Sequence, residues 1–189
     1  MTAPPAADAP KEEWRAWARA ERSAYDWEAI SKAVAGALLE WPPLLAASTV
    51  LGFMPMQGEI DLHAVLEADL SARKAVTRTP EHGGLTIHEL RGPFEVHRWG
   101  FLQPHASAPV IASEEIDVWL VPGLAFDLHG NRLGNGAGYF DGLLAGARKG
   151  AFLVGVVPVA LVADRLPSEA HDVPMGYLAT EEGIVEVAR

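Results

Sequence analysis

The chain has 189 residues, of which 25 are Asp or Glu and 15 are Lys or Arg, so its formal net charge is −10. This balance argues against general binding to nucleic acids or anionic membranes, because both need a basic surface, although a local basic pocket for a small phosphate ligand stays compatible with it. The chain contains no cysteine, which excludes disulfides, thiolate nucleophiles and zinc sites built on cysteine.

The first ten residues are typical of a short disordered tail, and we expect one domain over residues 11–189, a length that suits a single hydrophobic core. No basic segment followed by an apolar stretch is present, so no signal peptide is predicted. No apolar run approaches the roughly 20 residues that span a bilayer. We therefore expect a cytoplasmic protein with neither a membrane nor a nucleic acid as partner.

From residue 11 onward, helical segments alternate with apolar runs typical of buried strands. Helices are expected over 11–25, 27–40, 59–70 and 139–149, strands over 48–55, 74–78, 84–90, 116–126, 151–161 and 175–187, and a long connection over 91–114. The longer strand runs are apolar throughout, as in sheets covered on both faces. This order predicts a single α/β domain of three layers, α/β/α, with a mostly parallel sheet, whose ligands bind beyond the carboxyl ends of the strands.

The first helix carries a stripe of basic residues. Asp8 and Pro10 provide a cap and a first-turn proline for it. Lys11, Arg15 and Arg22 are separated by four and seven residues, so they share one face. The stripe either faces phosphate groups or forms a solvated face among neighbouring glutamates.

A glycine-rich segment, GNRLGNGAGYFD at 130–141, follows a predicted buried strand and precedes a predicted helix. Free backbone N–H groups and the helix dipole favour an anion at such a place. Tyr139 after Gly138 excludes both the Walker A loop and the dinucleotide fingerprint. The segment is either a phosphate cradle, in which Arg132 adds a fixed charge with planar donors, or a structural turn. The chain has no HExxH or GxSxG motif, which argues against zinc and serine hydrolases.

Three carboxylates are further candidates for a role in capping, metal binding or ligand binding. Asp141 either caps the helix that follows the glycine-rich segment or holds Mg²⁺ beside a nucleotide phosphate. Asp172 joins such a metal site only if the fold brings it near. Glu59, which follows Met54 and Met56, either caps the next helix or binds a polar aromatic ligand beside apolar side chains.

Residues 120–141, LVPGLAFDLHGNRLGNGAGYFD, resemble the signature of the 5-formyltetrahydrofolate cyclo-ligase family. That signature has an apolar strand, then Pro-Gly, Phe-Asp, Arg-Leu-Gly, alternating glycines, two aromatic residues and Asp. Further matches occur in the family's order and extend the resemblance over residues 11–182. They are Lys11 with Arg15, MPMQGEI at 54–60, Gln103-Pro104, Leu166-Pro167 and His171-Asp172.

The resemblance implies an α/β fold similar to the ribose-5-phosphate isomerase and CoA-transferase group. It also implies an enzyme that uses ATP and Mg²⁺ to convert 5-formyltetrahydrofolate, polyglutamylated or not, into 5,10-methenyltetrahydrofolate, with release of ADP and phosphate. A monomer is expected. Two alternatives stay open: a non-catalytic folate-binding or folate-buffering protein on the same scaffold, and a sugar-phosphate or CoA-handling enzyme of the wider fold group.

The resemblance further implies roles for individual residues. Lys11 and Arg15 contact the ATP phosphates, and Arg132 is the catalytic residue that stabilises the transferring phosphoryl group. Met54 and Glu59 line the pterin side of the folate, and the metal ligands are Asp141 and Asp172. The nucleotide loop consists of Arg132, Leu133, Gly134, Asn135, Gly136, Ala137, Gly138, Tyr139 and Phe140. Within it, Asn135, Gly136, Ala137, Gly138 and Tyr139 also contact the folate.

The chain departs from the family pattern in this loop and at one later position. Ala137 stands where many members have Lys, which removes a positive charge from the phosphate cradle, and Phe140 stands where Tyr is common. A Gln that often precedes the late Leu-Pro is missing near Ala160 and Leu161. We expect weaker ATP binding or slower turnover from the first of these departures.

Overall fold

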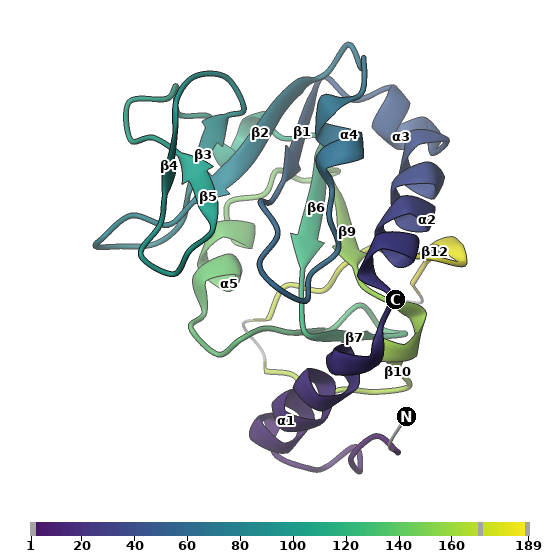
Figure 1. The fold of residues 1–189 in the computed structure, drawn as a ribbon. Coiled ribbons are helices and arrows are strands. Elements are labelled where there is room, and N and C mark those ends of the chain that lie inside the picture. The colour runs from purple at the N-terminus through teal and green to yellow at the C-terminus, as the bar shows by residue number, and fades with distance from the viewer. Residues whose placement is uncertain (1–2, 170–171, 188–189) are drawn as a thin grey trace.

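The main sheet has seven strands in a computed structural model that describes residues 3–169 and 172–187. They are β1 (Thr49–Gly52), β2 (Arg73–Arg78), β3 (Thr86–Glu89), β6 (Val118–Pro122), β9 (Phe152–Val156), β11 (Tyr177–Thr180) and β12 (Gly183–Glu186). Their order is β12-β11-β9-β6-β1-β2-β3 (Figure 1). The five strands from β11 to β2 are parallel, and the edge strands β12 and β3 are antiparallel to their neighbours. The predicted mostly parallel α/β sheet is confirmed.

The remaining elements surround this sheet. The helices are α1 (Lys11–Glu21), α2 (Trp27–Leu39), α3 (Pro42–Leu45), α4 (His63–Glu67) and α5 (Tyr139–Leu144), with short 3₁₀ turns η1 (Arg22–Ala24), η2 (Ser113–Glu115) and η3 (Val159–Leu161). A small sheet contains β7 (Ala125–Asp127), β8 (Arg132–Leu133) and β10 (Val162–Ala163), and a hairpin pairs β4 (Phe94–Val96) with β5 (Leu102–Pro104). None of the described helices is both long and apolar enough to cross a membrane.

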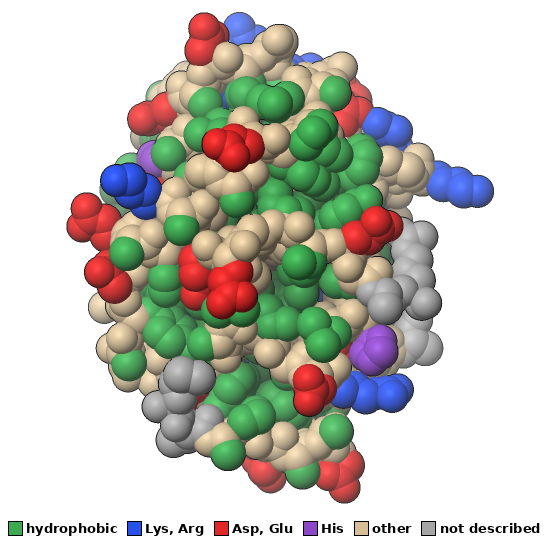
Figure 2. All heavy atoms as spheres, turned by 90° about the vertical axis from the view of Figure 1, so that its right-hand side faces the viewer, with side chains coloured by type: hydrophobic (Ala, Val, Ile, Leu, Met, Phe, Trp, Pro, Cys, Tyr) green, Lys and Arg blue, Asp and Glu red, His purple; other side chains and the backbone are tan. Residues whose placement is uncertain are grey.

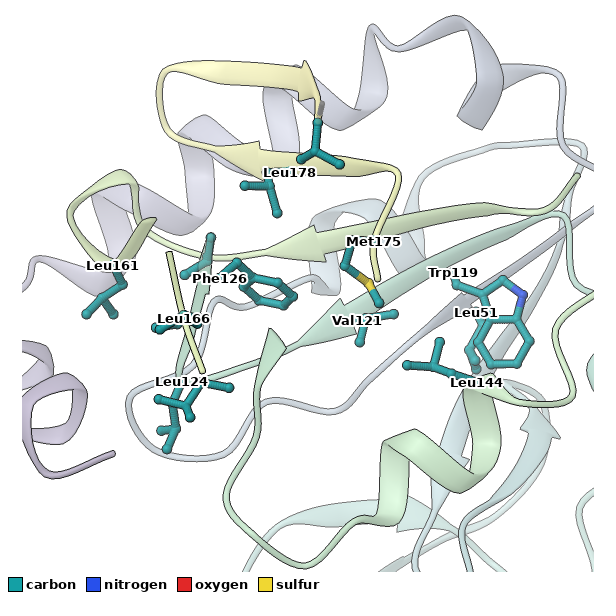
Figure 3. Packing of buried hydrophobic residues seen from close by; sticks show 14 of the residues in the cluster. Leu51, Trp119, Val121, Leu124, Phe126, Leu144, Leu161, Leu166, Met175 and Leu178 are labelled. Carbon is teal, nitrogen blue, oxygen red and sulfur yellow. The ribbon is translucent and has the colours of Figure 1, made fainter. Parts of the chain in front are cut away.

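Both faces of the main sheet are buried. Successive residues of β1 point to opposite sides: Leu51 belongs to a core cluster with Trp14 of α1 and Leu144 of α5, and Val50 belongs to another with Leu38 of α2. Figure 3 shows the first cluster, with Phe126 and Met175 packed among leucines. Burial on both faces is what the uninterrupted apolar strand runs predict. Figure 2 shows the outer surface on the right-hand side of Figure 1, where acidic side chains are spread over the face and basic ones lie mainly towards its edges.

Several expected elements are shorter or divided. The strand expected over 116–126 is wrong as one unit, since β6 ends at Pro122 and β7 belongs to the small sheet. The chain turns at Gly123, where a β-carbon would lie 2.6 Å from the Phe126 ring. The helix expected over 59–70 contains only α4, and the expected connection over 91–114 contains the β4–β5 hairpin.

Helix and strand ends differ from expectation in the same way. The strand expected over 151–161 ends at Val156 and gives way to η3, and the helix expected over 139–149 ends as α5 at Leu144. Asp8 does not cap α1, because the N-cap residue is Pro10 and no side chain makes a capping hydrogen bond there.

The turn between β7 and β8 is built around Asp127, which is fully buried. Its carboxylate accepts hydrogen bonds from the backbone N–H groups of His129, Asn131 and Leu166 at 2.8–2.9 Å. Gly130 within this turn has a φ of +81°, which side chains rarely allow. This turn fixes the start of the glycine-rich loop.

Replacement of Gly130 by Ala is expected to destabilise the fold strongly. A β-carbon there would lie 2.2 Å from the Met175 carbonyl oxygen, and the positive φ adds backbone strain. We expect the free energy of unfolding to fall by about 2–4 kcal/mol, in the range of other severe backbone substitutions. Urea unfolding followed by circular dichroism measures this. Ala at Gly150, which has a similar φ but open space around it, is the matched control and should cost less.

Candidate active site

A cavity of about 500 Å³ opens beyond the carboxyl ends of β1, β2 and β6, where a parallel sheet is predicted to bind ligands. Segments far apart in the sequence form its wall, including the start of α1, the segment after β1, the glycine-rich loop and the segment before β11. The cavity brings together every residue to which the sequence assigned a site role. These residues are Lys11, Arg15, Met54, Glu59, Arg132, Leu133, Gly134, Asn135, Gly136, Ala137, Gly138, Tyr139, Phe140, Asp141 and Asp172. Their individual roles stay predictions.

The glycine-rich loop rests on α1. The Nε of Arg15 donates a hydrogen bond to the Gly134 carbonyl oxygen at 3.1 Å. Gly136 and Gly138 have φ values of +102° and +69°, a conformation that glycine adopts without strain. Gly138 is the N-cap residue of α5, so the interpretation of Asp141 as the cap is wrong. The loop therefore presents backbone with few side chains to the cavity.

Arg132 lies almost completely inside the protein, with 8% of its side chain exposed. One guanidinium nitrogen is 2.6 Å from the Asp141 carboxylate, and the other donates to the Pro122 carbonyl oxygen at 3.4 Å. The guanidinium carbon lies 5.6 Å from the centre of the Phe140 ring, a cation–π contact. The buried Nε has no hydrogen-bond partner among the residues that the structure describes. The residue lines the cavity, while this one N–H stays buried and unpaired within the described part of the chain.

Lys11 occupies the acidic end of the cavity. Its Nζ lies 2.9 Å from Glu169 and 3.1 Å from Asp172. Burial lowers the pKa of Lys11, but hydrogen bonds and charge attraction from these two carboxylates outweigh burial and raise it. Asp141 and Asp172 both line the cavity, each paired with a different basic side chain. Within residues 3–169 and 172–187, no cluster of three or more acidic or histidine side chains is arranged to hold a metal ion by itself.

Glu59 lines the cavity from the segment after β1. Burial raises the pKa of its carboxyl group, and the Met56 N–H and the positive charge of Arg22 act against this rise. The Met56 N–H donates to the carboxylate at 3.0 Å. The N-cap residue of α4 is Leu62, so the interpretation of Glu59 as a helix cap is wrong. The half-buried carboxylate keeps unused acceptor capacity for a ligand with paired N–H donors.

The sequence interpretation missed further side chains at the cavity. Trp99 and Phe101, on the connection between β4 and β5, contribute to its wall, as does Glu169. Trp99 keeps 58% of its surface exposed, and His97 stacks on Phe101 with a centroid distance of 4.6 Å. The sequence did contain a signal for this part of the wall, because His97, Trp99 and Phe101 place three aromatic rings within five residues of a Gly- and Pro-rich segment.

The three basic residues of the first-helix stripe lie in two different environments. Lys11 and Arg15 line the cavity, whereas the Arg22 guanidinium donates to backbone carbonyl oxygens of Gly58, Gly123 and Leu124. The interpretation of the stripe as a solvated face is therefore wrong for all three residues.

Comparisons with known proteins identify the family of the chain. The chain matches the sequence model of the 5-formyltetrahydrofolate cyclo-ligase family over residues 11–181. It is 32% identical to a 5-formyltetrahydrofolate cyclo-ligase of Mycolicibacterium smegmatis over 170 residues, which cover 84% of this chain and 88% of that protein. It is 27% identical to the Escherichia coli K12 cyclo-ligase over 157 residues, with coverage of 79% and 86%.

A solved structure is similar over nearly the whole chain. The 5,10-methenyltetrahydrofolate synthetase of Aquifex aeolicus superposes with a TM-score of 0.80 at 29% identity, and the match covers 95% of this chain and 93% of that one. The family match, the relatives and the shared fold agree with the resemblance in the glycine-rich segment. The chain therefore belongs to the 5-formyltetrahydrofolate cyclo-ligase family and is an enzyme.

Proposed function

We propose that this enzyme converts 5-formyltetrahydrofolate into 5,10-methenyltetrahydrofolate and consumes ATP, with Mg²⁺ present, to give ADP and phosphate. The observation that carries the proposal is one cavity whose wall combines two chemically different groups of side chains. Lys11, Arg15 and Arg132 supply three cations to this wall, and Met54 and Glu59 supply an apolar surface and a carboxylate. Its volume of about 500 Å³ lies in the usual range of ligand sites.

The nucleotide side has the features that a triphosphate needs. Positive φ values at Gly136 and Gly138 let the backbone approach phosphate oxygens closely, and a side chain there would keep them apart. Arg132 and Arg15 both line the cavity, and Arg15 also holds the loop through the Gly134 carbonyl oxygen. We assign the loop from Arg132 to Phe140 to the nucleotide and its central residues, Asn135 to Tyr139, also to the folate.

On the folate side, Glu59 is placed to bind the pterin. A pterin ring carries paired N–H donors along one edge, and a carboxylate with two oxygens accepts both of them. Met54 provides a soft apolar contact next to it. Partial burial of Glu59 strengthens this recognition, because a lower local dielectric strengthens hydrogen bonds to its oxygens.

The proposed reaction has two steps. The formyl oxygen attacks the γ-phosphorus, the bond to the bridging oxygen breaks, and ADP leaves. The neighbouring folate nitrogen then attacks the activated formyl carbon, loses its proton and closes the ring, while phosphate leaves with the former formyl oxygen. Such chemistry depends on positioning and charge stabilisation rather than on a covalent nucleophile. Arg132 is assigned to stabilise the transferring phosphoryl group.

Asp141 and Asp172 are the proposed Mg²⁺ ligands. Mg²⁺ commonly binds one or two carboxylates together with substrate phosphates and water, so two carboxylates in one cavity fit it without a third. When bound, the ion neutralises charge on the phosphates. Asp172 and Asp141 pair with Lys11 and Arg132, so each proposed metal ligand lies beside a basic residue assigned to the phosphates.

We further propose that the protein is a monomeric cytoplasmic enzyme of one-carbon metabolism, whose folate substrate carries or lacks a polyglutamate chain. We propose an N-terminal tail over 1–10 and one domain over 11–189. The fold is proposed to be related to the ribose-5-phosphate isomerase and CoA-transferase group.

The test mixes purified protein, ATP, Mg²⁺ and 5-formyltetrahydrofolate and follows the near-ultraviolet absorbance of the methenyl product. We expect a rise that requires both ATP and Mg²⁺, with one ADP formed for each product molecule. A protein that binds the folate in calorimetry but forms no product would overturn the proposed reaction.

Replacement of Ala137 by Lys is expected to strengthen ATP binding. Ala137 is exposed at the tip of the glycine-rich loop, so a long side chain fits, and its charge reaches the proposed phosphate site. We expect the KM for ATP to fall about 3- to 10-fold, as for one added charge-assisted hydrogen bond at a partly solvated site. Ala137→Gln, which has similar length and no charge, is the control. Equal ATP affinities of the two variants would contradict the assignment.

A further inference from the structure

Arg22 joins two separate segments of the cavity wall through one guanidinium group. Its Nη1 donates to the Gly58 carbonyl oxygen at 2.5 Å, in the segment after β1. Its Nη2 donates to the carbonyl oxygens of Gly123 and, at 3.2 Å, of Leu124, in the turn after β6. These two segments come from neighbouring strands of the sheet. Arg22 itself belongs to η1, directly after α1.

The surroundings hold the guanidinium in place. The Trp27 ring lies 5.6 Å from the guanidinium carbon, and the Trp27 Nε1 donates to the Arg22 carbonyl oxygen at 3.2 Å. Gly58 has a φ of +78° and packs close to the same ring. Burial lowers the pKa of Arg22 while Glu59 raises it, and arginine stays charged at neutral pH in proteins. The contacts are thus charge-assisted and resist exchange with water.

Each segment that Arg22 holds leads directly to a residue of the proposed site. Gly58 precedes Glu59, which is assigned to the pterin. Gly123 follows Pro122, whose carbonyl oxygen accepts a hydrogen bond from Arg132. The helix α1, which ends just before Arg22, carries Lys11 and Arg15 in its first half. One side chain outside the reacting groups therefore connects the folate side, the nucleotide side and α1.

We propose that Arg22 is a positioning residue. It sets the distance between the segment that carries Glu59 and the turn after β6 that contacts Arg132, so that the formyl oxygen meets the γ-phosphoryl group. This inference rests on the proposed function. Group transfer is sensitive to placement, and a shift of about 1 Å can lower a rate by roughly 10²-fold. Because Arg22 is assigned to contact neither substrate, its loss should harm the reaction of the bound pair more than the binding of either substrate.

The experiment compares Arg22→Lys and Arg22→Ala with Arg19→Ala, an exposed arginine on the same helix. A lysine keeps the charge but lacks the planar fork that reaches both segments. For the two Arg22 variants we expect kcat to fall by roughly 10²-fold, while the dissociation constants of ATP and of 5-formyltetrahydrofolate, each measured alone by calorimetry, change less than about 3-fold. Arg19→Ala should match the unchanged enzyme.

A second readout separates positioning from general damage to the fold. Guanidinium ion added below denaturing concentrations fits the space left in Arg22→Ala and offers donors to the same carbonyl oxygens. We expect it to raise kcat of Arg22→Ala and to leave the unchanged enzyme and Arg19→Ala unaffected.

The outcomes can be told apart. If the unchanged enzyme is active and Arg22→Lys keeps the full kcat, the inference is overturned and the proposed function stands. A loss confined to substrate affinity, or a fall in kcat that only matches the folded fraction seen by circular dichroism, overturns the inference in the same way. If Arg22→Ala does not fold, Arg22→Lys decides by its kcat and its binding constants. An inactive unchanged enzyme overturns the proposed function and this inference with it.

Discussion

Replacement of Arg132 by Ala is expected to lower kcat by about 10³-fold or more while the fold survives, as found when a main donor to a transferring phosphoryl or oxyanion is removed. The guanidinium is 8% exposed and fixed by Asp141, the Pro122 carbonyl oxygen and the Phe140 ring. Such a preorganised group costs little rearrangement when charge develops beside it. The absorbance assay gives kcat, and thermal unfolding followed by circular dichroism shows whether the fold is intact.

The controls for this prediction test charge and placement separately. Arg132→Lys keeps a positive charge but loses the fork that contacts Asp141 and Pro122 together, so its kcat should lie between those of Arg132→Ala and the unchanged enzyme. Arg91→Ala removes an arginine whose side chain is 83% exposed and pairs with Glu89, and it should leave kcat unchanged. Normal turnover by Arg132→Ala would sink the assigned role.

Replacement of Glu59 by Gln is expected to weaken folate binding and to stabilise the fold at neutral pH. The amide keeps one acceptor for the Met56 N–H but offers its NH₂ group where a pterin presents donors. A buried polar mismatch of this kind should raise the KM for 5-formyltetrahydrofolate by roughly 10²-fold or more. The KM for ATP should stay within a factor of about 3, because Glu59 is assigned to the folate side alone.

The stability effect follows from the pKa of Glu59. Burial raises this pKa above its ordinary value of 4.5 in the folded protein, so the folded state favours the protonated acid. The contribution of Glu59 to stability is therefore complete below pH 4.5 and is lost as the pH rises through the raised pKa. Glutamine does not titrate. The melting temperature of Glu59→Gln should match that of the unchanged enzyme at low pH and exceed it at neutral pH; a variant that is less stable at neutral pH would contradict this.

The sequence was informative where one local pattern determines the structure. Uninterrupted apolar runs predicted the central strands, since a parallel sheet is buried on both faces. Four closely spaced glycines predicted the loop that lines the cavity, and two of them, Gly136 and Gly138, adopt positive φ there. The resemblance in the same segment led to the family that the comparisons confirm.

The sequence was misleading where tertiary contacts decide. Residues 116–126 look like one apolar strand, yet the chain changes sheet at Gly123, because the Phe126 ring packs directly against that glycine. Arg22 looked equivalent to Lys11 and Arg15 by helical spacing. Its partners are the carbonyl oxygens of Gly58, Gly123 and Leu124, which lie 36 to 102 residues further along the chain. A periodicity records which residues share a face, but not what that face meets.

The position of α1 also governs when this enzyme becomes complete during its synthesis. The helix is synthesised before its partners: the Gly134 carbonyl that Arg15 binds lies 119 residues later, and the Asp172 carboxylate that Lys11 binds lies 161 residues later. At about 5–20 residues per second, the helix waits roughly 8–30 s for its last partner. Throughout that interval its apolar side, with Trp14 and Ala18, has no completed core to cover it. The nascent chain is therefore most exposed to chaperones and proteases at its N-terminal helix, and a ribosome that stops before residue 172 releases a product without a finished active site.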